Sequence, residues 1–165
     1  MKVIYALFER YADARDAVNE LLDQGYDQDE MNAIVQAHIA QEHIDLDLGS
    51  VGVQVTDAVG NKTVRGFDPF LAAQAPVPVP GLGDMYAAGE LATTLAKTAA
   101  IHGGRVKGLQ SALDDFVPSD VARDFADSVG SGSLLFWIRT DDERAGHVAQ
   151  TLGRHHGKRV RDYVG

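Results

Sequence analysis

The chain has 165 residues, 45% hydrophobic and 24% charged, which is enough to bury a core without a disulfide or metal staple. It has no cysteine, which excludes disulfides, cysteine-ligated zinc or iron–sulfur sites and a cysteine nucleophile. Its 24 acidic and 15 basic residues give a net charge of −9, which repels phosphate groups and argues against binding to nucleic acid or anionic lipid.

Apolar runs in the sequence are short. The longest, residues 3–8 and 134–138, fall far below the roughly 20 residues of a membrane span. The N-terminus turns polar by Glu9, whereas a signal peptide needs a longer apolar core. We therefore expect no membrane span and a cytoplasmic protein, and the lack of cysteine fits such a reducing compartment.

The first 38 residues predict a strand, a helix and a second strand. Residues 3–8 form an apolar run typical of a buried strand. Apolar residues then recur at helical spacing from Ala14 to Leu22, and Gly25 is suited to end that helix. Residues 31–37, centred on Ile34 and Val35, predict the next strand.

The last 35 residues repeat this order. Residues 134–139 predict a strand, and Ala145 to Leu152 recur at helical spacing, with a stop at Gly157. Thr140 and Glu143 have the spacing of a capping box at the start of this helix. Residues 159–164 predict the final strand.

The two ends together predict an α+β fold. Two β-α-β units give a ferredoxin-like (split β-α-β) four-stranded antiparallel sheet with two helices on one face. We expect a single domain over 1–165, with core halves 1–38 and 131–165 and a large, mostly helical insertion at 39–130. Within the insertion, the sequence predicts a hairpin at about 54–67, a proline-rich linker at 75–81, and helices over about 84–129, in segments 84–101, 105–116 and 119–129.

Several segments carry a family resemblance. They are Ala6-Leu7-Phe8, residues 12–18, residues 21–26 ending in Gly25-Tyr26, Pro80-Gly81-Leu82-Gly83, and Gly132-Ser133-Leu134-Leu135. Together they resemble the bacterial general-stress (heat-induced stress) proteins. The resemblance implies a stress-associated role, but it brings no reaction and no catalytic residues.

One pattern has the chemistry of a metal site. Residues 43–48 alternate polar and apolar, so a strand there would place His43, Asp45 and Asp47 on one face, with His38 nearby. Imidazole and carboxylate groups bind divalent metals. The same alternation also describes a strand with one solvated face. Both interpretations stay open.

Other polar residues have simpler explanations. Glu90 lies within the predicted helix over 84–101, which is rich in small residues, and we expect it on the exposed face. His155 and His156 lie in the last turn of the predicted second helix, where cationic groups interact favourably with the helix dipole. Trp137 lies in a predicted core strand, so we expect it to pack.

Three functions remain open on the sequence. The first is a stress-associated, non-catalytic binding or assembly module, expected to form a homo-oligomer through its sheet or its alanine-rich helices. The second is a small-ligand or metal-sensing domain that uses His38, His43, Asp45 and Asp47. The third is an enzyme on a dimeric ferredoxin-like scaffold, acting on a small hydrophobic substrate; a pocket lined by Tyr5, Trp137 and a histidine would favour it. We predict no cofactor and no catalytic residue, and the sequence identifies no ligand.

Overall fold

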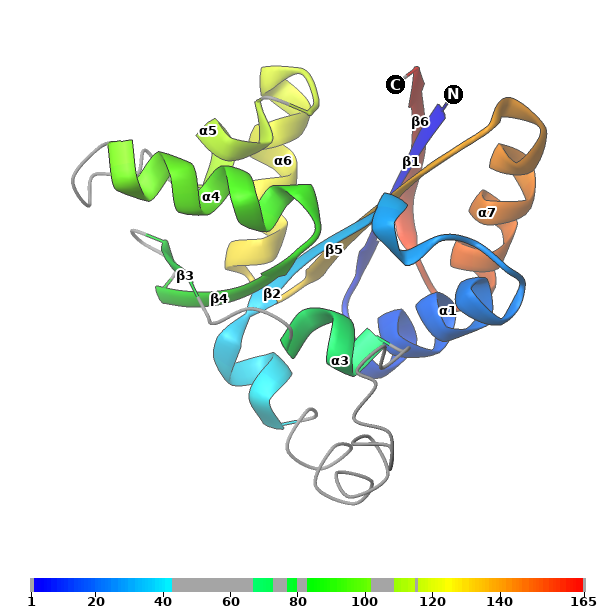
Figure 1. Cartoon of the computed structure of the whole chain (residues 1–165), viewed down its shortest axis with the longest axis horizontal. Helices are drawn as coiled ribbons and strands as arrows, with labels where there is room; N and C mark the ends of the chain where they lie inside the picture. The colour runs from blue at the N-terminus through cyan, green and yellow to red at the C-terminus, as the bar shows by residue number, and fades with distance from the viewer. Residues whose placement is uncertain are drawn as a thin grey trace, which may run out of the picture.

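One antiparallel sheet organises the chain (Figure 1). The computed structural model describes residues 2–42, 67–72, 77–79, 83–101, 109–114 and 116–164. Within this part of the chain, six strands are hydrogen-bonded in the order β3-β4-β2-β5-β1-β6. Their bounds are β1 Lys2–Phe8, β2 Met31–Gln36, β3 Val77–Val79, β4 Gly83–Ala88, β5 Leu134–Thr140 and β6 Lys158–Val164.

The two ends of the chain form the elements that their sequences predict. Helix α1 (Tyr11–Asp23) connects β1 to β2, and α7 (Asp142–Arg154) connects β5 to β6. Strand β5 lies between β1 and β2 and is antiparallel to both, with Ile138 opposite Ile4 and Met31. The two β-α-β units are therefore interleaved in one sheet, so residues from opposite ends of the sequence share one core.

The sheet has six strands rather than the predicted four. The predicted linker contains strand β3, and the predicted helix from residue 84 begins as strand β4. Strand β4 pairs with β2, where Tyr86 lies opposite Val35, and β3 pairs with β4. Pro78 is tolerated because β3 is an edge strand, which needs no ladder hydrogen bond on its outer side.

The rest of the insertion is helical where the structure describes it. Helices α4 (Glu90–Ile101), α5 (Leu109–Leu113) and α6 (Ser119–Gly130) follow β4, and α3 (Phe67–Ala72) precedes β3. A further helical segment covers residues 37–42, and the short helix η1 (Gln28–Glu30) precedes β2. The predicted hairpin at 54–67 lies outside the described residues except for Phe67, which begins α3.

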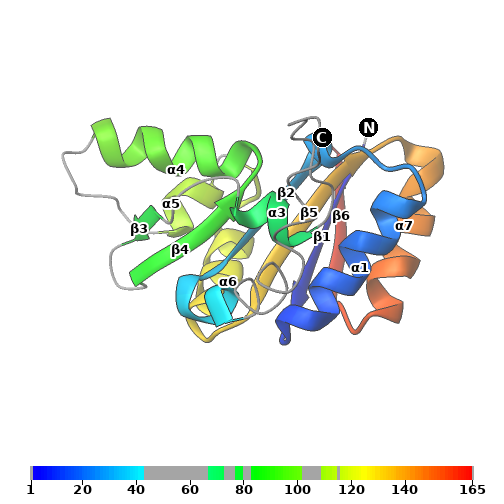
Figure 2. The same ribbon diagram turned by 60° about the horizontal axis from the view of Figure 1, so that its bottom comes forward.

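Helices cover both faces of the sheet (Figures 1 and 2). The terminal layer, formed by α1, α3 and α7, covers one face. The central layer, formed by α4, α5 and α6, covers the other. Successive strand residues point to opposite faces of the sheet. Ile4, Ala6 and Phe8 pack in the core under the terminal layer, and Tyr5 and Leu7 pack in the core under the central layer. Neither face of the described sheet is left bare.

Two predicted helix ends differ in detail from the structure. The α7 N-cap is Asp141, whose Oδ1 accepts from the Arg144 N–H at 2.8 Å, because Thr140 still belongs to β5. Gly25 takes φ +94° after α1, as predicted, but after α7 the left-handed residue is His156, at φ +68°. Gly157 is required for space instead, since a Cβ there would lie 2.6 Å from the Leu152 carbonyl oxygen.

Candidate binding groove between α7 and β6

An open groove lies between helix α7 and the outer end of the sheet. Its cavity of about 270 Å³ is open to solvent, and we call it the α7–β6 groove. Ile4 of β1 and Val160 of β6 supply apolar lining, and Ala145 and Ala149 supply more from α7. The complete lining is Lys2, Ile4, Asp142, Ala145, Gly146, Ala149, Val160, Arg161 and Asp162.

Small residues on α7 make room for the groove. Asp142, Ala145, Gly146 and Ala149 are spaced by three or four residues, so they share one side of the helix. A Cβ added at Gly146 would meet no atom within 4 Å. Larger residues at these positions would therefore fill the space between α7 and β6.

Charges of both signs stand around the groove. The Lys2 ammonium donates to Asp162 Oδ2 at 3.0 Å, joining the edge strand to β1. This hydrogen bond and the lysine charge hold the pKa of the Asp162 carboxyl below its usual range. Arg161 is exposed and makes no ion pair with any residue that the structure describes. Arg161 lies opposite Tyr5, so its side chain is on the sheet face of the central layer, whereas Val160 and Asp162 face α7 and the groove.

Strand β6 is the edge of the sheet beside the groove. It pairs with β1 on one side and has no described strand on the other. Its pairing shifts register between Tyr5 and Leu7, and Arg159, at φ +52°, lies in this bulge. Lys158 contacts Glu9 at 2.7 Å and Arg159 contacts Asp124 at 3.5 Å. These two basic side chains are thus turned back onto their own chain.

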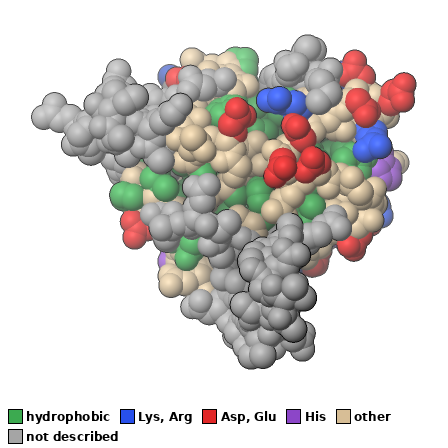
Figure 3. Space-filling view, viewed as in Figure 1, with side chains coloured by type: hydrophobic (Ala, Val, Ile, Leu, Met, Phe, Trp, Pro, Cys, Tyr) green, Lys and Arg blue, Asp and Glu red, His purple; other side chains and the backbone are tan. Residues whose placement is uncertain are grey.

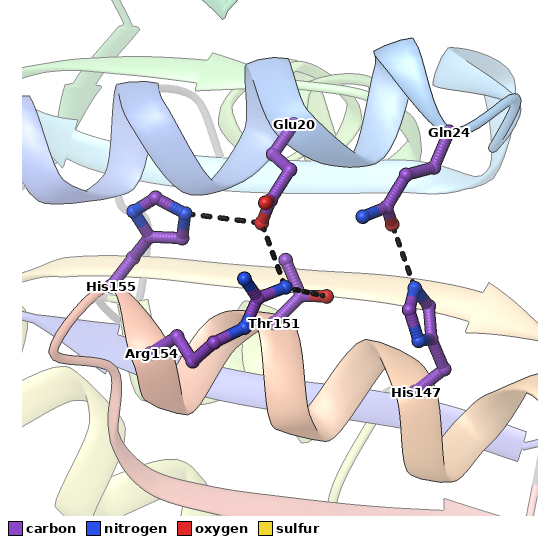
Figure 4. Close-up of polar contacts among 6 residues, drawn as sticks. All are labelled: Glu20, Gln24, His147, Thr151, Arg154 and His155. Atoms are coloured by element: carbon purple, nitrogen blue, oxygen red, sulfur yellow. Dashed lines mark hydrogen bonds and ion pairs between the residues drawn. The ribbon is translucent and has the colours of Figure 1, made fainter.

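A row of polar contacts joins α7 to α1 (Figure 4). Glu20 Oε2 lies 3.1 Å from His155 Nε2 and 3.2 Å from Arg154 Nη2. One helical turn along α1, Gln24 Oε1 lies 3.0 Å from His147 Nε2. Thr151 is buried and its hydroxyl oxygen accepts from Arg154. We call these six residues the α1–α7 seam; it aligns the helix that forms one wall of the groove.

Tyr26 continues this contact beyond the end of α1. Its ring stacks on His147 with centroids 6.3 Å apart, and the Arg144 guanidinium lies 5.5 Å from the ring centre. Burial raises the pKa of the Tyr26 hydroxyl, Arg144 opposes this and Asp141 adds to it. The tyrosine is therefore a neutral packing group over a wide pH range.

The predicted metal ligands are not brought together in the described structure. His38 is exposed in the helical segment at 37–42, whereas His43, Asp45 and Asp47 lie outside the described residues. Among the residues described, no group of three or more histidine or acidic side chains is arranged to hold a metal ion. The four-residue metal site stays a prediction.

Tyr5 and Trp137 pack within the core beneath the central layer. Their ring centroids are 5.2 Å apart, Phe116 lies 5.2 Å from Trp137, and Phe125 stacks on Tyr5 at 5.5 Å. Both are at most 3% exposed, which confirms the packing role predicted for Trp137. The Tyr5 hydroxyl donates to the Phe116 carbonyl at 3.4 Å, so Tyr5 and Trp137 pack in the core and do not line the described groove.

Glu90 and His155 each contact a side chain that can carry the opposite charge. Glu90 is 68% exposed and lies 3.9 Å from Arg139, which also approaches Glu30 at 3.8 Å. His155 forms the C-cap of α7 and pairs with Glu20.

Sequence patterns could not identify the groove, because no pattern showed that β6 lies beside the small residues of α7.

Among the coloured residues on the face shown in Figure 3, carboxylates predominate over cations, in line with the net charge of −9. Among the described helices, none is both long and apolar enough to cross a membrane. The chain matches no protein-family model, no curated protein and no solved structure. The resemblance to general-stress proteins therefore remains a prediction.

Proposed function

We propose that this chain is a non-catalytic binding module that holds another polypeptide in the α7–β6 groove. The observation that carries the proposal is the groove itself, an open hollow with apolar lining and charges of both signs, beside a strand edge that no described strand pairs. Apolar contact gives affinity, and charged groups around it fix register and partner choice. A short polypeptide segment suits such a site better than a small molecule, which needs a more enclosed pocket.

The fold type, the role and the location expected from the sequence are also part of this proposal. The strands β6, β1, β5 and β2 with α1 and α7 form a ferredoxin-like core, to which β4, β3 and the central layer are added. The stress-associated role and the cytoplasmic location follow from the sequence resemblance and composition. Helices on both faces of the sheet favour association through the groove rather than through a sheet face.

Two glycine positions on α7 give a matched test. A Cβ at either Gly146 or Gly153 meets no atom within 4 Å, but only Gly146 lines the groove. We expect Gly146→Leu to fill the groove and keep the fold, because leucine is a better helix former than glycine. Gly153→Leu is the control.

The measurement is capture of partners from the host by each tagged variant, followed by binding of the purified partner to the purified chain. We expect wild type and Gly153→Leu to bind alike and Gly146→Leu to lose at least tenfold in affinity. Equal binding by all three folded proteins would remove the groove as the binding surface and overturn the proposal.

A further inference from the structure

Resting on this proposed function, we infer that the partner presents an extended acidic segment, which adds as a strand to the outer edge of β6. Added strands gain affinity from main-chain hydrogen bonds and specificity from pockets that take alternate side chains. The α7–β6 groove adjoins β6 and offers such a pocket. Edge and groove therefore form one surface.

The two edges of the sheet differ in their capacity to accept a strand. Strand β3, at the opposite edge, has three residues, and Pro78 stands in its centre. Proline lacks an N–H group, so this edge offers little to an added strand. Strand β6 has seven residues and no proline. Of the two described edges, β6 is the one able to extend the sheet.

The basic charge of β6 favours an acidic partner segment. Lys158, Arg159 and Arg161 make it basic in a chain whose net charge is −9. Lys158 and Arg159 contact Glu9 and Asp124, whereas Arg161 has no such ion pair among the described residues. An added strand with apolar side chains toward the groove would place its alternate carboxylates near Arg161 on the opposite face of the sheet, where they gain a charge-assisted contact and a basic segment is repelled.

A second copy of the chain fits this edge poorly. Two β6 strands related by a two-fold axis at Arg161 would place that arginine opposite itself, and an axis at Val160 would place Arg159 opposite Arg161. An axis at Asp162 would oppose two carboxylates. Like charges directly opposite each other destabilise a strand pair, and the bulge at Arg159 disturbs the ladder further. These three registers are unfavourable, so an acidic segment fits this edge better than a second β6 strand.

Two ten-residue peptides test this inference, one alternating valine with glutamate and one alternating valine with lysine. We expect the acidic peptide to shift the backbone amide resonances of residues 158–164 and Gly146 in a ¹⁵N NMR titration. The basic peptide should bind at least tenfold more weakly. Arg161→Glu should reverse the order of affinity for the two peptides. Arg123→Glu makes the same charge change at an exposed residue of α6 and should leave that order unchanged.

Several results would overturn the inference. They are equal affinity for the two peptides, no binding by either at millimolar concentration, shifts confined to residues outside β6 and the groove, or a dimer that Arg161→Glu dissociates. If Gly146→Leu weakens binding of the captured partner but Arg161→Glu does not, the acidic-strand inference fails and the proposed function stands. If neither substitution weakens binding, both fail.

Discussion

Both helical layers pack apolar cores on one sheet, but they differ in their other contacts. The central layer is joined to it by aromatic rings, with Phe125 and Phe116 against Tyr5 and Trp137 at 5.2–5.5 Å. Beneath the terminal layer the core is also apolar, but α1 and α7 meet each other through exposed or half-buried polar groups, such as Glu20 and His155. Stability is expected to depend more on individual side chains in the central layer, whereas the terminal layer leaves room for a groove.

Removal of a central ring should give the largest effect. Phe125 is 1% exposed and stacks on Tyr5. Phe125→Ala should lower the free energy of unfolding by about 3–5 kcal/mol, because it leaves a cavity under the helices. Urea denaturation followed by circular dichroism measures this loss. Phe125→Leu should cost less than half as much, and a loss below about 1 kcal/mol for alanine would contradict the comparison.

The junction between β4 and the central layer should be nearly as sensitive. Gly89 has φ +82°, and a Cβ there would lie 2.2 Å from the Met31 carbonyl oxygen. Asn32 Oδ1 beside it accepts from the Leu91 N–H at 2.9 Å, holding the start of α4. Gly89→Ala should therefore cost roughly 2–4 kcal/mol, from backbone strain and a steric clash together.

Gly25 is the matched control for this substitution. It has φ +94°, but a Cβ there meets no atom within 4 Å. Gly25→Ala should cost only the left-handed conformation, about 1 kcal/mol. Equal losses for the two variants in thermal and urea unfolding would show that the contact with Met31 is unimportant.

The difference between the layers also explains what the sequence could predict. The strands and helices at both ends follow from local apolar spacing, which is complete within each segment. Residues 84–88 contain methionine and alanine, which favour helix, yet they form β4 because β2 and β3 pair with them on both sides. The groove likewise depends on β6 lying beside α7, a contact between elements that no local pattern records.

The α1–α7 seam should be much less sensitive than the central layer. Glu20 is 31% exposed and shares one oxygen between His155 and Arg154. Pairs this close to solvent contribute about 0–1 kcal/mol, so Glu20→Gln should lower the free energy of unfolding by less than about 1 kcal/mol. The effect should shrink in 1 M salt. A loss comparable to that of Phe125→Ala would show that the seam, rather than the apolar core, secures the terminal layer.

The smallest expected effect is a pH dependence at the edge of the groove. Lys2 lowers the pKa of Asp162, so the folded state holds that proton less readily than the unfolded state. The resulting stabilisation is complete above the ordinary aspartate pKa and is lost as the pH falls below about 4. Asp162→Asn and Lys2→Met should each flatten the dependence of unfolding free energy on pH in this range, and the double variant should flatten it no further. Additive effects in urea titrations between about pH 2 and pH 5 would mean that Lys2 and Asp162 act independently.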